Sequence, residues 1–239
     1  MMNISRMRFY AVLLLALARA WAPSATAREA KPGREEGEFR ILVAGKEIGT
    51  EKYVIVSSPE SASSSSSLDF RNPAEIRQKI HFETRLDMGA HYLPRAYELR
   101  SDVDGKKGSI IGEFRPNEAF FEYGSAVPPK KSGLLVGSQY TLLDTNIFHH
   151  FIFLVRLFDF DSKEKTQKFQ VVIPQETDSG ILRISELGKE ILVVGGRKVG
   201  THQLRADTGS LQIQLWVDDK HVLHRIVVQD RDIEVIRRP

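Results

Sequence analysis

The stretch EIRQKIHFETRLDM, residues 75–88, decides the fold because its side chains change character at every second position. One set of alternate positions carries uncharged side chains: Ile76, Gln78, Ile80, Phe82, Thr84, Leu86 and Met88. The other set carries charged or basic side chains: Glu75, Arg77, Lys79, His81, Glu83, Arg85 and Asp87. A period of two predicts a long β-strand with one face in water. Because antiparallel sheets are the kind that keep one wet face, we expect hairpins and meanders.

Shorter alternating segments surround this strand and are separated by turn residues. They are residues 39–43 and 53–55, 97–103 and 108–114, and 211–217 and 221–229. Asp104-Gly105 is the strongest turn signal, since both central residues of a tight hairpin turn prefer positive φ. About ten strands result, at the spacing of a sandwich, a barrel or an open curved sheet. The pattern therefore predicts a mostly β chain.

One hairpin sequence occurs twice with small changes. ILVAGKEIGT at residues 41–50 resembles ILVVGGRKVGT at residues 191–201. A duplicated half of the protein is one interpretation. The other is a pair of similar hairpins that use glycine for the same steric reason, which turn chemistry favours.

Residues 57–72 depart from the β pattern because they contain five consecutive serines, Ser63 to Ser67. Such a composition offers little apolar surface to bury. We therefore expect a disordered loop between strands in this serine-rich segment.

Residues 144–158 depart from it in another way. Ile147, Phe151, Leu154, Val155 and Phe158 recur at helical spacing behind Asp144, a plausible N-cap. A strongly apolar helix in a β chain needs a surface to cover. We expect it to pack on the concave face of a long antiparallel curved sheet or open half-barrel.

The first 27 residues predict export. Arg6 and Arg8 form a basic start, an apolar stretch follows, and Ala25-Thr26-Ala27 is a small-x-small cleavage site. The apolar stretch is shorter than the about 20 residues that span a bilayer, so no membrane span is expected after cleavage. Residues 28–239 would then form a single β-rich domain, periplasmic or secreted.

Composition limits the chemistry of that domain. The chain has no cysteine, so disulfides and thiolate chemistry are excluded. The net charge of +3 equals the three arginines of residues 1–27, which carry no acidic residue. Without them the chain is formally neutral and has no long basic run, so nucleic acid is not an expected partner.

The histidines and hydroxyl groups carry no recognisable catalytic or metal motif. His149 and His150 are adjacent, and adjacent helical residues point too far apart to chelate one ion. His221 and His224 are three residues apart and would lie on opposite faces of a strand. A Gly-x-Ser-x-Gly elbow is missing from the sequence, and a triad is a spatial fact that one sequence cannot show. We predict no metal, no cofactor, no catalytic residue and no enzymatic activity.

Three short motifs resemble a group of uncharacterised exported bacterial proteins: LDTNIFHH at residues 143–150, LWVD at 215–218 and EVIR at 234–237. These proteins distantly resemble the periplasmic lipoprotein-carrier superfamily. That resemblance implies a long antiparallel sheet curled into a half-barrel, with helices closing its concave side and acyl chains bound in the cavity. The present chain departs from the carriers by having one obvious helix.

The sequence therefore predicts an exported, non-enzymatic protein that binds an apolar or amphipathic envelope ligand, a lipid or an acylated partner. The predicted ligand-lining residues are Phe148, Phe151, Ile152 and Val155. Three alternatives stay open. The helix simply completes the core, or a sheet edge binds an envelope protein as an assembly scaffold, or the chain is a hydrolase with an unrecognised site.

Overall fold

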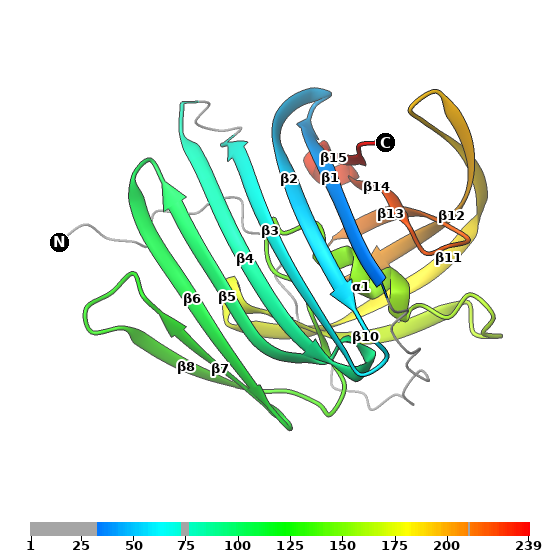
Figure 1. Cartoon of the computed structure of the whole chain (residues 1–239). Coiled ribbons are helices and arrows are strands. Elements are labelled where there is room, and N and C mark those ends of the chain that lie inside the picture. Colours follow the sequence, from blue (N-terminus) through cyan, green and yellow to red (C-terminus); the bar gives the residue numbers. More distant parts are fainter. Residues whose placement is uncertain (1–32, 73–76, 210) are drawn as a thin grey trace.

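The computed structural model describes residues 33–72, 77–209 and 211–239, in which one sheet of fifteen strands curls around one α-helix (Figure 1). The predicted signal segment, residues 1–27, lies outside the described residues. The strands are β1 (Gly33–Val43), β2 (Lys46–Ser57), β3 (Ser61–Arg71), β4 (Lys79–Gly89), β5 (Pro94–Val103), β6 (Lys106–Arg115), β7 (Glu118–Tyr123), β8 (Lys130–Leu135), β9 (Thr141–Leu142), β10 (Thr166–Ile173), β11 (Asp178–Val194), β12 (Arg197–Asp207), β13 (Gln212–Asp218), β14 (Leu223–Val228) and β15 (Ile233–Arg237). The helix is α1 (His150–Leu157), and 3₁₀ turns cover Ala90–Tyr92, Pro174–Glu176 and Gln229–Arg231.

The sheet is open and almost entirely antiparallel. Its order runs from β8 down to β1, then from β15 down to β9, so β1 pairs with β15 and both ends of the described chain lie in mid-sheet. Only the short β9 pairs in parallel, with β10. The two edge strands are β8 and β9. The predicted mostly β fold with an open curved sheet is confirmed, with more strands than the roughly ten expected from turn spacing.

The alternating stretch forms β4 as predicted, although β4 begins at Lys79 rather than at residue 75. Ile80, Phe82, Leu86 and Met88 are buried on the inner face of the sheet. The intervening positions, from Lys79 to Asp87, are exposed or half-buried.

The prediction of a disordered loop over residues 57–72 is wrong, because the serine run lies in β3. β3 pairs along its whole length with β2 on one side and β4 on the other. Its inward positions Ala62, Ser64, Ser66 and Leu68 are buried. Serine composition does not predict the structure of this segment, because β2 and β4 form hydrogen bonds with its backbone on both sides. Its small inward side chains also leave room for the turn that leads into α1, where Ser64 contacts His149.

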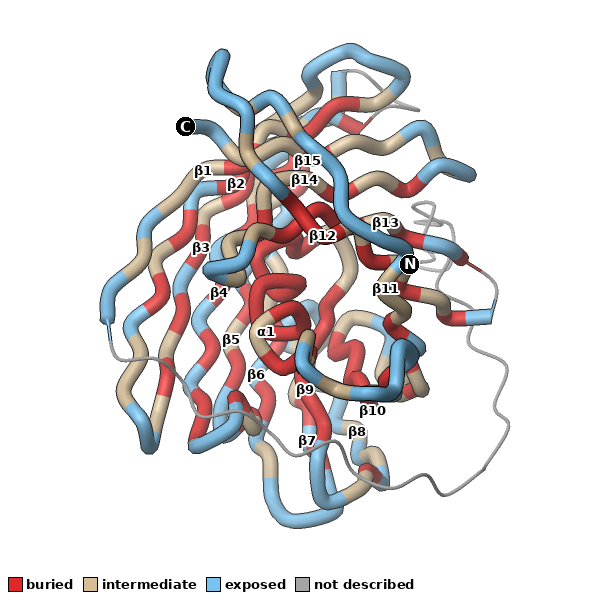
Figure 2. Tube along the Cα trace, turned by 90° about the vertical axis from the view of Figure 1, so that its right-hand side faces the viewer, coloured by how far each residue is buried: buried red, intermediate tan, exposed pale blue. Residues whose placement is uncertain are grey.

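The predicted helix is shorter than residues 144–158, and Asp144 is not its N-cap. Asn146 has a positive φ of 64°, which interrupts any helix that starts at Asp144. The helix begins at His150 after His149 and ends at Leu157, where Phe158 turns to extended backbone. Its predicted place is confirmed: Figure 2 shows α1 as a buried element surrounded by strands.

The hairpin turns follow the predicted turn chemistry. Asp104 and Gly105 both have positive φ between β5 and β6. The repeated sequence forms two hairpins, β1–β2 and β11–β12, with left-handed glycines at Gly45 and at Gly195-Gly196.

Candidate functional site

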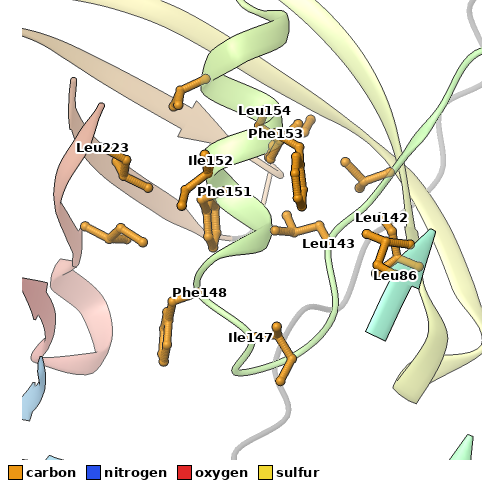
Figure 3. Packing of buried hydrophobic residues seen from close by; sticks show 14 of the residues in the cluster. Leu86, Leu142, Leu143, Ile147, Phe148, Phe151, Ile152, Phe153, Leu154 and Leu223 are labelled. Carbon is orange, nitrogen blue, oxygen red and sulfur yellow. The ribbon is translucent and has the colours of Figure 1, made fainter. Parts of the chain in front are cut away.

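The site is built around α1, whose residues are buried on every side. Seven of its eight residues are buried, and only Arg156 is half-buried. The predicted ligand-lining residues Phe148, Phe151, Ile152 and Val155 all belong to the apolar core. Figure 3 shows Phe151 and Ile152 on the side of Leu223 of β14 and Phe153 on the opposite side. The structure therefore brings the four residues together, and their role toward a ligand stays a prediction.

A buried carboxylate fixes the start of this helix to the sheet. Oε2 of Glu51 in β2 accepts the backbone N–H groups of Phe148 and His149 at 2.9 and 3.1 Å. Oε1 lies 2.6 Å from Nδ1 of His149. Both side chains are completely buried. Glu51 thus attaches the turn that precedes α1 to a strand that is 97 residues away from Phe148 in the sequence, and it satisfies two buried backbone N–H groups there.

The inner hydroxyl groups of β3 continue this network. Ser64 Oγ lies 3.2 Å from Nε2 of His149, so the imidazole bridges a carboxylate and a hydroxyl group. Ser66 Oγ lies 2.8 Å from Thr84 Oγ1 of β4. These contacts satisfy polar atoms that would otherwise be unpaired in the core.

Asp144 anchors the other side of the turn that leads into α1. Its carboxylate accepts the hydroxyl of Tyr97 at 2.7 Å and the backbone N–H of Gln175 at 2.9 Å. Burial raises the pKa of Asp144 from 3.8 to about 6, although these hydrogen bonds act in the opposite direction. Burial also raises the pKa of Tyr97 well above 10.0, and the Asp144 charge adds to the shift. The pair is therefore held in a dry environment.

His150 is buried beside His149 and is the least satisfied member of the network. Nδ1 of His150 accepts the backbone N–H of Asp144 at 3.2 Å, and Nε2 has no hydrogen-bond partner among the described residues. The two imidazole rings lie 4.5 Å apart. Burial, with a smaller contribution from His149, lowers the pKa of His150 well below 6.5. His150 is therefore a neutral core side chain at neutral pH.

The two shifts make opposite contributions to stability. Asp144 binds its proton more tightly when folded, so its contribution is full below about pH 4 and is lost as the pH rises through about 6. The folded state binds the His150 proton less tightly than the unfolded state does. The contribution of His150 to stability is therefore full above pH 6.5 and is lost as the pH falls.

The C-terminal end of α1 is fixed by a partly buried ion-pair cluster. Glu35 of β1 pairs with Arg156 of α1 and with Arg237 of β15. Burial alone would raise the pKa of Glu35, but the hydrogen bond from Arg237 and the charge of Arg156 outweigh it and lower the pKa. We call the contacts of Glu51, Ser64, His149, Tyr97, Asp144, Glu35 and Arg156 the helix latch.

The solvent-facing side of the sheet carries a separate, polar groove. It has a volume of about 880 Å³ and is floored by Ser65 and Ser67 between charged side chains such as Lys52 and Arg85. None of the predicted ligand-lining residues lines it. The polar groove is therefore separate from the four predicted ligand-lining residues.

Chemically, the network contains one arrangement with catalytic geometry. Glu51, His149 and Ser64 follow the order carboxylate, imidazole, hydroxyl that activates a serine nucleophile. Ser64 is 3 % exposed, so a substrate cannot reach its hydroxyl while α1 is in place. No group of three potential metal ligands occurs within residues 33–72, 77–209 and 211–239. None of the helices described there is long and apolar enough to cross a membrane.

The sequence analysis missed Glu51, Ser64 and Tyr97. A signal was present for Glu51, because it shares the inward positions of β2 with Tyr53 and Ile55. A carboxylate among inward apolar positions marks a buried partner. Ser64 gave no such signal inside a run of identical residues.

Comparison with known proteins shows the fold alone. No protein-family model and no curated protein matches the chain. A crystal structure of a beta-barrel-like protein of the domain of unknown function DUF1849 from Brucella abortus is similar, with a TM-score of 0.55 and 10 % sequence identity. The match covers 86 % of this chain and 94 % of that one. It supports an all-β architecture shared with an uncharacterised family.

Proposed function

We propose that this protein is an exported, non-enzymatic carrier that binds an apolar or amphipathic envelope ligand, a lipid or an acylated partner. The ligand lies against the concave face of the sheet, in the space that α1 occupies. The observation that carries the proposal is that a short, mostly apolar helix is held in a curled sheet by the largely buried polar contacts of the helix latch.

The attachment of α1 supports a displaceable helix. Within the described residues, every hydrogen bond between residues 148–158 and the strands involves a side chain, such as Glu51 or Ser64. The sheet ladders do not depend on α1, and the edges β8 and β9 leave the sheet open. α1 can therefore leave without breaking a strand pairing.

The energetics are consistent with an exchange of α1 for an acyl chain. Displacing the helix removes Phe151, Ile152 and Val155 from the core, and an acyl chain recovers about 0.8 kcal/mol for each buried methylene. A hydrogen bond contributes only about 0.5–1.5 kcal/mol net to stability, because the unfolded groups bind water instead. A latch built from Glu51 and His149 therefore holds α1 in a defined place without the strength of a fully apolar contact.

Titration with a fluorescent fatty acid tests the proposal. We expect saturable binding by the wild type and tighter binding by Glu51→Gln, which weakens the latch. Phe120→Asp, on the outer surface of β7, is the control and leaves binding unchanged. Lack of binding by all three proteins, together with no copurifying lipid, would refute the carrier function.

Scaffolding through a sheet edge is the second candidate, favoured by β8. This edge strand is exposed or half-buried throughout, and Leu135 at its end is 78 % exposed. An extended segment of an envelope protein could add to it as a further strand. The substitution Gly133→Pro removes a backbone N–H donor from β8 and should then abolish capture of that partner.

A hydrolase is the third candidate, favoured by the Glu51–His149–Ser64 arrangement. It requires that α1 moves away from Ser64. Labelling by a fluorophosphonate probe that disappears in Ser64→Ala would support it. Absence of labelling in the wild type and in Arg156→Gln, which loosens α1 through its ion pair with Glu35 and leaves the Glu51–His149–Ser64 arrangement intact, would exclude it.

A further inference from the structure

The long hairpin of β11 and β12 extends beyond the sheet as a two-stranded arm, residues 187–200 (Figure 1). β10 stops pairing with β11 at Ser185, and β13 pairs with β12 only from Thr201 onward. The arm therefore has two backbone edges without a neighbouring strand in the described residues.

One face of the arm combines exposed apolar and basic side chains. Ile191 and Val193 are 66 % and 65 % exposed and lie on the same face, because they are two residues apart in one strand. Lys198 lies directly opposite Val193 in the ladder, and Lys189 precedes Ile191 on this face. The arm residues of this face include no acidic side chain, and the one acidic neighbour is the exposed Asp219 at the base, 3.6 Å from Lys189 Nζ.

The base of the arm is held firmly to the sheet. Trp216 Nε1 donates to Oε2 of Glu190 on the opposite face of the arm at 2.8 Å. The His202 imidazole lies 2.7 Å from Glu186 and 2.9 Å from Asp219. The tip of the arm also approaches the C-terminal residue, since a Cβ at Gly195 would lie 2.6 Å from the Pro239 side chain. The arm is therefore held at both ends, while Ile191 and Val193 stay exposed.

We propose that the arm docks the protein onto the surface of an anionic phospholipid bilayer. Ile191 and Val193 insert at the level of the headgroups, and Lys189 and Lys198 lie beside the lipid phosphates. Apolar side chains flanked by lysines suit this boundary, because burial and electrostatic attraction act together. The unpaired backbone edges keep the arm in the headgroup layer, since hydrocarbon could not satisfy them.

This inference does not depend on the carrier function, because the arm and α1 are separate parts of the molecule. Vesicle binding and acyl binding can each occur without the other. A second copy of this chain, or a protein that adds a strand to the arm, is the competing occupant.

Cosedimentation with vesicles tests the inference on the exported protein. Vesicles of equal parts phosphatidylglycerol and phosphatidylcholine are compared with vesicles of phosphatidylcholine alone. We expect binding to the anionic vesicles, lost in the double variant Ile191→Asp, Val193→Asp. Lys189→Gln and Lys198→Gln each weaken it about fivefold, the equivalent of about 1 kcal/mol per lysine. Val56→Asp, at an exposed apolar position of β2, is the matched control and retains binding.

Trp216 gives an independent readout, because its indole contacts the base of the arm. In the exported protein, from which cleavage after Ala27 removes Trp21, Trp216 is the sole tryptophan, and its emission should change on addition of anionic vesicles. Equal binding to both vesicle types, or binding unaffected by the arm variants, overturns the inference. The inference is also overturned if the wild type is a dimer that does not bind vesicles and the double variant is a monomer.

Discussion

Replacement of Glu51 by leucine should loosen α1 more than any other single change in the latch. The substitution keeps a similar volume but removes the acceptor for two backbone N–H groups and for the His149 imidazole. Each buried donor that loses its acceptor costs about 1–3 kcal/mol, so the loss of all three should exceed the loss of one. Glu51→Gln should cost less, about 1–3 kcal/mol, because its amide oxygen still accepts the backbone N–H groups.

Urea denaturation measures these losses, and hydrogen exchange locates them. We expect residues 150–157 to lose amide protection in Glu51→Leu while β3 and β4 keep theirs. Glu47→Leu is the control, since Glu47 lies on the same strand in an exposed ion pair worth less than about 1 kcal/mol. If Glu51→Leu costs no more than Glu47→Leu, the latch does not hold the helix and the reasoning fails.

Three further predictions follow from single residues. Asp144→Asn should become more stable relative to the wild type by about 2 kcal/mol between pH 4 and pH 7, because the buried carboxyl of the wild type ionises over that range. Parallel melts would show an unchanged difference in stability if the prediction is wrong. Gly49→Ala should destabilise the protein by about 1–3 kcal/mol, because the added Cβ would lie 2.2 Å from the Asp69 carbonyl oxygen. Gly200→Ala, at the equivalent position of the repeated hairpin, meets no atom within 4 Å and should be tolerated. Equal melting temperatures of the two variants would contradict this prediction. Export should cleave the chain after Ala27, which the intact mass of the exported protein decides.

The sheet could be predicted because its signals are local. Alternation in residues 75–88 and the Asp104-Gly105 turn each depend on a few neighbouring side chains, and the structure confirms both. The serine run shows where local composition misleads. The serine run forms a strand because it pairs with β2 and β4 on either side. The serine sequence alone does not predict this pairing.

The latch could not be predicted for a related reason. Glu51 and His149 are 98 residues apart in the sequence, and Ser64 and His149 are 85 residues apart. Only the curl of the sheet around α1 places them in contact. The apolar helix itself was visible from spacing, but its true start depended on the left-handed Asn146, which spacing does not reveal.

Hydrogen exchange of α1 with and without a fatty acid tests the central claim most directly. If an acyl chain takes the place of α1, amides of residues 150–157 should exchange faster when the ligand is bound, while the strands β2 to β5 stay protected. Binding of the fatty acid with α1 fully protected would contradict displacement of the helix. Absence of both binding and any change in exchange would contradict the carrier function itself.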